Sequence, residues 1–446
     1  MSDAITYRYA SPSALEKTSM GDQLLLSHFN EVKKDLQPCF FYGKLTDPYI
    51  IARCLITLSN IVQSSFSLSS FQLALLKDPI VTAGNQKMRF EGFSQCAGVY
   101  GRVDVLEDGL DGEFLSTGTT NVDFNQPMIS SLSRVNKTDK VLLSVGSKDV
   151  TVIAETRKVV ERKVPLPVKW IKGLTSVQIF LARTEKHFSF NRVQTLQLFQ
   201  TIPSGKSKSD YFLVVRGGRP MFSPVASAGA LCVGGVHRLR LLEQLVPHIS
   251  ELRVFADPEM QATSWQLYFG KVRFSFTLSR DAWRGFSGEG AALEDLIGDV
   301  PDQWINQLDQ YSHANHAFNP TMLAIDEGID FERLASITAR LSAMGLLGYD
   351  VDDNQFYYRQ LPYKLGRIMS LNPRLKAANK LIEEKGVTIV SNKDDRVEAL
   401  VAGTAVQHTV ILDKGRERCT CTWFSQNQGE RGLCKHVLAV KIKLQS

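Results

Sequence analysis

The chain reads CTCTWFSQNQGERGLCKHV over residues 419–437. Three cysteines and one histidine fall here in two close pairs, Cys419-Thr420-Cys421 and Cys434-Lys435-His436, with twelve residues between the pairs. Structural zinc takes four tetrahedral ligands, commonly three thiolates and one imidazole, and four protein ligands leave no open position for a substrate. The spacing therefore predicts a closed structural Zn2+ site in which each pair acts as a local clamp.

The segments around the two pairs predict a small unit of two strands and a helix. Residues 398–401 and 406–412 are strand-like on either side of Gly403 and predict a hairpin. A C-x-C pair in a continuous strand would point both thiols to one face, and we expect the chain to turn there so that both thiols can reach a single ion. The second pair is expected to begin a helix, where the helix N-terminus and Lys435 would lower thiol pKa values.

This arrangement of C-x-C, a loop and C-x-H at a helix start resembles the SWIM zinc finger, with Cys419, Cys421, Cys434 and His436 as zinc ligands. The larger chain also resembles bacterial SWIM-finger proteins. That resemblance is carried by four stretches: Thr119–Asn125, Arg162–Pro167, Trp283–Gly290 and Arg359–Tyr363. Such proteins are similar to ones encoded beside MoxR-type ATPases and von Willebrand A-domain proteins. The resemblance therefore implies these two proteins as partners.

Upstream of the finger, the patterns predict a multidomain α+β chain. We expect an N-terminal α+β domain at residues 1–155, a second α+β domain at 156–300, a winged-helix-like domain at 301–390 and the finger at 391–446. The third domain rests on apolar residues at helical spacing from Phe331 to Met344, followed by Gly345 and two short strands. In the second domain, residues 175–181 predict a strand.

The composition is that of an ordinary globular protein. The chain has 446 residues, of which 43% are hydrophobic and 22% charged. Its net charge of +6 permits acidic partners without demanding them. We expect a cytoplasmic protein without a membrane partner, because no secretion signal or spanning segment is visible and the seven cysteines are an odd number that suits a reducing compartment.

One stretch is strongly basic. Residues 157–172 hold six basic residues against Glu161, and Trp170 adds an aromatic ring. Such a stretch could neutralise phosphates and stack on bases; the alternative is a solvated strand and linker. The candidate contacts to nucleic acid or to a protein partner are Arg157, Lys158, Arg162, Lys163, Lys169, Lys172 and, beside the zinc site, Lys435.

Other polar groups are weaker candidates. A ligand pocket in residues 100–300 would need Thr119, Asp123, Arg284 and Glu289 to come together; otherwise turn chemistry explains these residues. A second metal site at His313 and His316 lacks an acidic partner at helical spacing.

No catalytic motif is visible, so the leading hypothesis is a non-enzymatic zinc-binding adaptor that uses its finger for nucleic-acid or protein interaction. Two alternatives stay open. One is an accessory subunit of a MoxR ATPase and von Willebrand A protein system. The other is an enzyme with an unrecognised site in residues 100–300.

Overall fold

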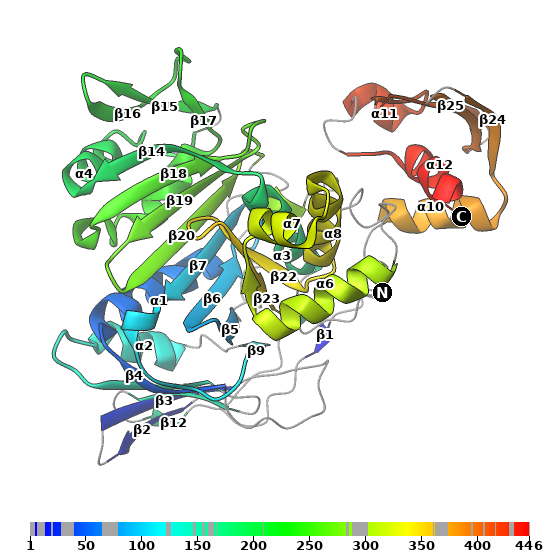
Figure 1. The fold of residues 1–446 in the computed structure, drawn as a ribbon. Helices are drawn as coiled ribbons and strands as arrows, with labels where there is room; N and C mark the ends of the chain where they lie inside the picture. Colours follow the sequence, from blue (N-terminus) through cyan, green and yellow to red (C-terminus); the bar gives the residue numbers. More distant parts are fainter. Residues whose placement is uncertain are drawn as a thin grey trace.

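The computed structural model describes the chain from residue 40 to 445 with gaps, and a few strands upstream. The described residues are 5–6, 14–18, 21–27, 40–64, 79–121, 126–145, 149–153, 157–158, 165–166, 168–207, 209–281, 285–287, 302–359, 361, 373–393, 396–404, 406–414, 416–427 and 432–445. Side chains are described in these ranges except before residue 40, at 149–172 and at a few element ends. The fold is mixed α+β, as the sequence predicts (Figure 1).

An eight-stranded antiparallel sheet forms the centre of the body. Its strands in spatial order are β14 (Glu185–Asn191), β18 (Glu251–Ala256), β19 (Ala262–Tyr268), β20 (Val272–Ser279), β7 (Val99–Val105), β6 (Lys87–Phe93), β5 (Ile80–Gly84) and β9 (Gly118–Asn121). The central strands β7 and β20 are buried along their whole length, so both faces of the sheet are covered.

Smaller elements surround this sheet. A seven-stranded sheet has the order β12 (Arg157–Lys158), β2 (Ala14–Thr18), β3 (Gly21–Ser27), β11 (Asp149–Ile153), β10 (Val141–Val145), β4 (Phe41–Leu45) and β8 (Leu110–Phe114). A three-stranded sheet has the order β16 (Arg219–Ser223), β15 (Tyr211–Arg216) and β17 (Leu231–Val233), and β1 (Ile5–Thr6) pairs with β13 (Pro165–Leu166). The helices here are α1 (Pro48–Gln63), α2 (Gln126–Arg134), α3 (Val168–Ala182) and α4 (Arg192–Gln200).

The two faces of the eight-stranded sheet differ in chemistry because side chains alternate along each strand. One face is apolar: Val103 of β7 and Phe274 of β20 belong to a core that also contains Leu58 of α1. The other face carries buried charges, among them Arg102 of β7 and Arg273 of β20. A buried charged face needs charged partners from a second element.

A winged-helix-like unit supplies those partners, as the sequence predicts for this region. Its elements are α6 (Asp302–Asn315), β21 (Ala317–Phe318), α7 (Pro320–Glu327), α8 (Phe331–Ala343), β22 (Leu347–Asp350) and β23 (Gln355–Tyr358). The short strands form a sheet in the order β21-β23-β22, so that the hairpin returns beside the strand between the first two helices. Leu334, Ile337 and Leu341 of α8 share a hydrophobic core with Leu174 and Val177 of α3.

Asp350, at the end of β22, lies against the charged face of the sheet. Arg273 Nη2 lies 2.5 Å from Asp350 Oδ2 and 3.1 Å from Asp104 Oδ2, and Arg102 Nε lies 3.0 Å from Asp104 Oδ1. Burial alone would raise the pKa of Asp350, but the positive charges of Arg273, Arg102 and Arg89 outweigh it and hold this pKa well below its usual range. The carboxylate therefore stays ionised and paired at neutral pH.

A second buried ion pair also joins the winged-helix-like unit to the eight-stranded sheet. Arg359, just after β23, places Nη1 2.5 Å from Glu91 Oε2 of β6, and its Nη2 donates to the Leu174 carbonyl at 2.7 Å. Tyr100 Oη donates to the same Glu91 carboxylate at 2.5 Å. The side chains of Arg359 and Glu91 are both fully buried, so this contact fixes the hairpin on the sheet without water in between.

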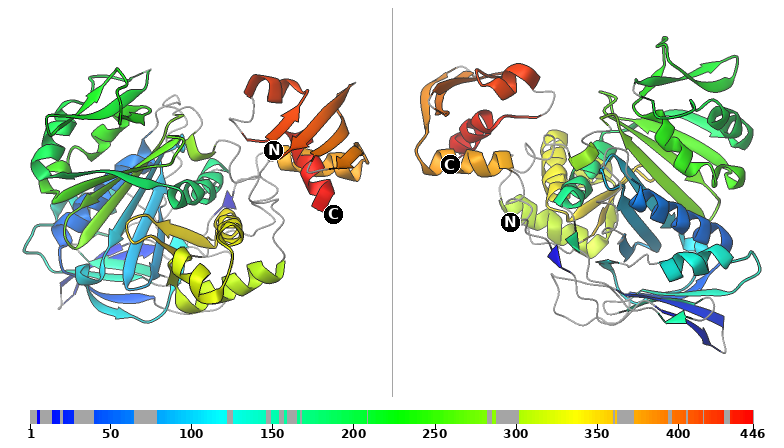
Figure 2. Two further views of the ribbon diagram at one scale, coloured as in Figure 1. Left: turned by 45° about the horizontal axis from the view of Figure 1, so that its top comes forward. Right: turned by 180° about the vertical axis from the view of Figure 1, so that it is seen from behind.

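The finger forms its own unit. Its sheet has the order β24 (Val387–Lys393), β25 (Arg396–Ala402), β26 (Gln407–Asp413) and β27 (Arg416–Cys419), and its helices are α10 (Pro373–Glu383), α11 (Thr422–Asn427) and α12 (Lys435–Gln445). The β25–β26 pairing confirms the predicted hairpin. All residues of its hydrophobic core come from the range 375–442, and Figures 1 and 2 show the unit, in orange to red, beside the body.

Three predictions need correction here. The boundary expected at residues 155 and 156 does not separate two cores, because β7 and β20 pair within one sheet. The boundary expected at residues 390 and 391 falls inside β24, and α10 packs on α12, so the finger unit begins near residue 373. The strand expected at residues 175–181 is part of α3, which is buried on several sides and so shows no clear helical period.

Candidate metal centre

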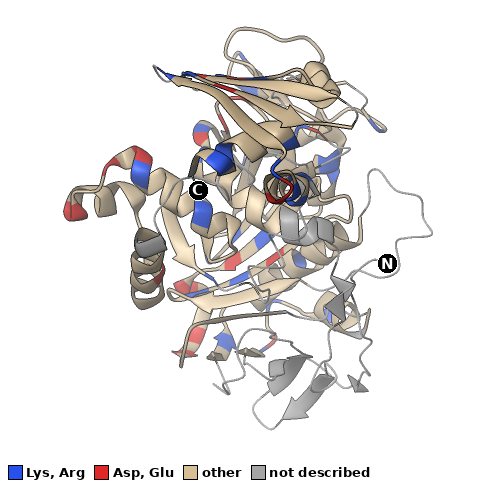
Figure 3. Cartoon of the chain, turned by 90° about the vertical axis from the view of Figure 1, so that its right-hand side faces the viewer, with Lys and Arg blue, Asp and Glu red and all other residues tan. Residues whose placement is uncertain are grey.

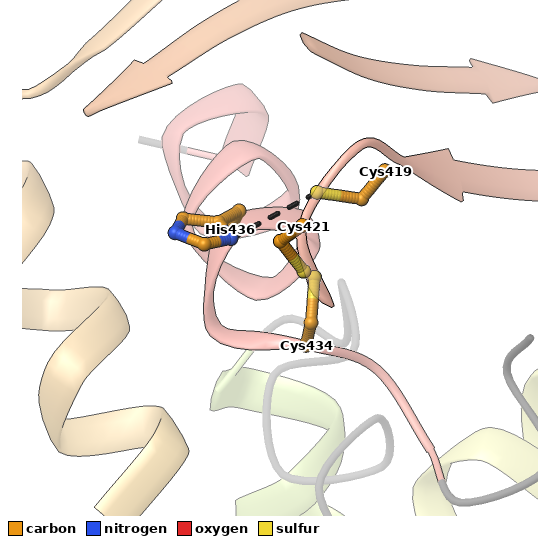
Figure 4. A group of neighbouring side chains, drawn as sticks. All are labelled: Cys419, Cys421, Cys434 and His436. Carbon is orange, nitrogen blue, oxygen red and sulfur yellow. Dashed lines mark hydrogen bonds between the residues drawn. The ribbon is translucent and has the colours of Figure 1, made fainter. Parts of the chain in front are cut away.

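Each predicted zinc ligand lies at the end of a secondary-structure element. Cys419 is the last residue of β27, Cys421 immediately precedes α11, and Cys434 immediately precedes α12. His436 lies in the first turn of α12. The strand ends at Cys419, so the chain turns between the first two cysteines as predicted, and both side chains point toward the ligand cluster (Figure 4).

The four side chains converge on one point. One ligand atom from each residue lies within 4.8 Å of the other three, and Cys419 Sγ lies 3.8 Å from His436 Nδ1 (Figure 4). Zn–S bonds of about 2.3 Å in a tetrahedron would place neighbouring ligand atoms roughly 3.8 Å apart. All four residues are buried, with exposed fractions from 1% to 7%. The geometry therefore fits a closed Cys3His zinc site.

Backbone groups are directed at two of the sulfurs. Phe424 N–H donates to Cys421 Sγ at 3.4 Å, and Val437 N–H donates to Cys434 Sγ at 3.5 Å. Both donors belong to the first turns of helices, where N–H groups have no partner within the helix. Such donors stabilise thiolates, which are the form of cysteine that binds zinc.

The thiols also influence one another before an ion binds. The hydrogen bond with Cys419 lowers the pKa of Cys434 to about 4, helped by the contact with His436, although burial of the thiol acts in the opposite direction. The same hydrogen bond, together with burial, raises the pKa of Cys419. Zinc binds the thiolate form of cysteine, so binding of the ion releases the protons that these thiols carry.

His408 of β26 lies next to the ligand histidine. The ring centroids of His408 and His436 are 4.5 Å apart, and His408 Nδ1 lies 3.5 Å from Thr420 Oγ1. Burial, and then the charge of His436, lower the pKa of His408. A neutral His408 covers the site without adding positive charge beside it.

Arg374 of α10 connects the zinc site to the rest of the finger. Its Nη1 donates to the Leu433 carbonyl at 2.7 Å, directly before Cys434. Its guanidinium carbon lies 4.7 Å from the centre of the Trp423 ring, and Trp423 follows Cys421 in α11. One side chain therefore contacts the chain next to both ligand pairs.

We expect Arg374→Ala to raise the rate of zinc loss to a chelator by about tenfold, because residues that support ligands tune metal affinity by roughly 10–100-fold. The measurement is the absorbance change of a colorimetric chelator over time. Lys376→Ala is the matched control, since Lys376 is exposed on the same helix. Equal release rates in the two variants would contradict a supporting role for Arg374.

The structure places one of the other predicted site residues, Lys435, directly between the zinc ligands Cys434 and His436. Lys435 is half-buried at the start of α12. Arg157 and Lys158 form β12, and Lys169 and Lys172 lie in α3, but their side chains are outside the described ones; Arg162 and Lys163 lie outside the described residues altogether. The candidate basic surface is therefore still a prediction.

The residues of the predicted ligand pocket are mostly outside the described residues. Asp123, Arg284 and Glu289 belong to this group. Thr119 is buried in β9, where its hydroxyl lies 3.3 Å from that of Thr82. His313 packs on the Tyr358 ring at 5.1 Å, and in the described part of the chain no metal-holding group besides the zinc cluster is found.

Sequence reasoning missed Arg374 and Trp423 as supports of the site. Arg374 is 60 positions before Cys434, and nothing in its local sequence relates it to the ligands. The one available signal was the position of Trp423 two residues after Cys421, since a large aromatic ring beside a metal clamp needs a packing partner.

Comparisons with known proteins bear on the finger most directly. Residues 408–445 match the family model of the SWIM zinc finger. No curated protein matches the chain. The chain is similar to two solved structures, the proliferating cellular nuclear antigen of Entamoeba histolytica and the PCNA2–PCNA3 complex of Sulfolobus tokodaii. Each is 9% identical to this chain, with a TM-score of 0.36, and each match covers 54% of this chain. The matches cover 98% of the first structure's chain and 99% of the second's.

No helix in the described ranges is both long and apolar enough to cross a membrane. The family match and the buried Cys3His cluster together show that the chain carries a SWIM zinc finger that binds Zn2+ through Cys419, Cys421, Cys434 and His436.

Proposed function

We propose that this protein is a non-enzymatic adaptor whose zinc-stabilised finger binds nucleic acid or a protein partner. The observation that carries the proposal is the closure of the metal site: four buried protein ligands leave the ion no free position for a substrate. Such an ion holds a folded surface in place, and the function then belongs to that surface.

The outer face of the finger sheet is the surface in question. The inner face packs on the helices, where Lys441 of α12 lies 2.7 Å from Glu417 of β27. Arg416 and Arg418 alternate with Glu417 and are exposed, so they lie on the outer face. The pairing register adds further residues to this face: Lys393, Arg396, Glu398, Leu400, Thr409, Ile411 and Asp413.

This face combines positive charge with apolar groups. Its four basic residues exceed its two acidic ones. Asp413 lies 3.9 Å from Arg396 and is also the cross-strand neighbour of Arg416. Elsewhere on the chain, Lys and Arg are interspersed with Asp and Glu in the view of Figure 3. Basic side chains beside each other on an open sheet are suited to phosphates, and Leu400 and Ile411 are suited to apolar groups of a protein.

We expect full-length protein to shift a labelled nucleic acid at low salt, with an affinity that falls as salt rises. Arg416→Ala combined with Arg418→Ala should weaken binding for every sequence and lower the slope of log affinity against log salt by about 2, one for each lost phosphate contact. Mobility-shift titrations over a salt series measure the slope.

The matched control is Lys376→Ala combined with Lys380→Ala, which removes two exposed cations from α10 on the opposite side of the sheet. This control should keep the slope of the original protein. An absence of any shift at low salt would rule out nucleic acid and leave protein docking as the finger's role.

The accessory role beside a MoxR ATPase and a von Willebrand A protein stays a prediction from resemblance. It predicts that both proteins co-purify with this chain from its native host, and their absence would count against it. An enzymatic site in residues 100–300 also stays a prediction, since Asp123, Arg284 and Glu289 lie outside the described residues.

A further inference from the structure

A groove lies between α3 of the body and the winged-helix-like unit. It has a volume of about 300 Å³ and lies between α3, α7, α8 and the β22–β23 hairpin. Its walls are apolar or carry hydroxyls. Arg183 is the one charged residue of the lining, which also includes Thr321, Phe331 and Ala335. No carboxylate, histidine or cysteine lines it, so the lining supplies no carboxylate or imidazole base to activate its hydroxyl groups.

Large apolar side chains surround the mouth of this groove. Phe331, which lines it, is 57% exposed at the start of α8. On α7, Ile325 is 63% exposed and lies one turn after the groove residue Thr321, while Met322 is 56% exposed. Three exposed residues of this size within ten positions are typical of an interaction surface rather than of scattered surface residues.

The same edge is acidic. Asp326 and Glu327 end α7, and Glu332 lies in the first turn of α8; all three are exposed. No Lys or Arg of the described residues forms an ion pair with them. The N-cap residue Asp330, which accepts from the Glu332 and Arg333 N–H groups, adds a fourth negative charge.

The position of two of these charges is unfavourable for the free protein. Asp326 and Glu327 lie in the last turn of α7, where the helix dipole favours cations, and no basic residue is present in that turn. A positively charged partner would remove this repulsion. These two charges do not stabilise α7, and they favour a partner that carries positive charge.

Nucleic acid does not suit this surface. A winged helix that binds DNA places its recognition helix, the second helix of the helix-turn-helix motif, in the major groove next to phosphates. Here that helix is α8. Its exposed first turn carries both Glu332 and Arg333, and part of its surface faces α3 across the groove. The acidic end of α7, with Asp326 and Glu327, and the neighbouring helix α3 both oppose such binding.

We propose that the groove between α3 and α8 binds an amphipathic helix of a partner protein, with an apolar side chain in the cavity and lysines or arginines beside the acidic edge. The apolar face of the partner would cover Met322, Ile325 and Phe331, as in other complexes in which a helix lies in a hydrophobic groove. Its basic residues would pair with Asp326, Glu327 and Glu332. The charge of the edge defines the partner, because an acidic helix would be repelled.

The probe is a fluorescein-labelled helical peptide made of leucine and lysine, with leucines at every third or fourth position. Fluorescence anisotropy with the full chain should show saturable binding that weakens with salt. The analogue with glutamate in place of lysine should not bind, and the analogue with alanine in place of leucine should bind at least about tenfold more weakly.

Two variants test the location. Ala335→Trp fills the groove from an exposed helix position, and Asp326→Lys combined with Glu327→Lys reverses the edge while improving the charge at the end of α7. Each should weaken peptide binding by about tenfold or more. Two controls should bind the peptide normally: Val193→Trp, at an exposed position of α4, and Asp111→Lys combined with Glu113→Lys on β8.

Three results would overturn the proposal. The leucine–lysine peptide fails to bind, or it binds both groove variants as well as the controls. Alternatively, sedimentation of the full chain shows a dimer that Ala335→Trp dissociates, which would make a second copy of the chain the occupant of the groove. Circular dichroism of each variant ensures that only folded proteins are compared.

Discussion

Cys434→Ser is expected to release the zinc ion and to unfold residues 373–445 while the body stays folded. Cys434 is 1% exposed and accepts a backbone hydrogen bond at the start of α12, so serine leaves neither a thiolate nor a good fourth ligand. Structural zinc contributes about 10 kcal/mol or more to the folding of isolated finger peptides, and a small core cannot replace that amount.

The separation of the cores explains why the effect should be local. The finger core draws its residues from the range 375–442, whereas the two cores of the body draw theirs from the range 40–361. Metal analysis should find no zinc in the variant. Hydrogen exchange should show lost protection in α12 and in β25 to β27, with β7 and β20 unchanged.

Cys232→Ala is the matched control, because Cys232 is also a buried cysteine but lies in β17 of the body. It should retain a full complement of zinc. Full zinc content in Cys434→Ser would contradict the ligand assignment. Loss of protection throughout the body would show instead that the finger stabilises the whole chain.

The zinc site could be predicted from the sequence because its information is local. Two pairs, Cys419 with Cys421 and Cys434 with His436, lie within eighteen consecutive residues, and their spacing alone indicates a metal. The helix from Phe331 and the following hairpin were equally accessible, since each depends on a period within one short segment.

The organisation of the body could not be read in this way. Residues 87–91 alternate polar and apolar side chains, a pattern that normally indicates a strand with one face in water. Here Arg89 and Glu91 are buried, because Asp350 and Arg359 cover them from a segment more than 250 residues later. No local pattern reveals a charged face that is neutralised by so distant a part of the chain.

The predicted domain boundary failed for the same reason. Residues 99–105 of β7 pair with residues 272–279 of β20, so one sheet joins both sides of residue 155. Long-range antiparallel pairing leaves no mark on the composition of either strand. The start of the finger was predicted too late in the chain for a different reason. The sequence of α10 is that of an ordinary amphipathic helix, and only its packing on α12 assigns it to the finger.

The Glu91–Arg359 pair should carry the largest stability effect in the body. Arg359→Met removes the cation and leaves the Glu91 carboxylate buried, with Tyr100 as its remaining hydrogen-bond donor among the described side chains. Breaking a fully buried ion pair on one side costs about 3–5 kcal/mol. Urea unfolding monitored by tryptophan fluorescence should show this loss as a lower midpoint with an unchanged slope.

The double variant Glu91→Gln combined with Arg359→Met decides between two explanations. If the cost of Arg359→Met comes from the uncompensated carboxylate, the neutral glutamine removes that charge and the double variant should be more stable than Arg359→Met alone. If the cost comes from lost packing and from the hydrogen bond to the Leu174 carbonyl, adding Glu91→Gln should not restore stability. A restored midpoint would mean that the buried pair adds little stability and chiefly specifies where the winged-helix-like unit docks on the sheet. The docked position of this unit in turn forms the groove between α3 and α8.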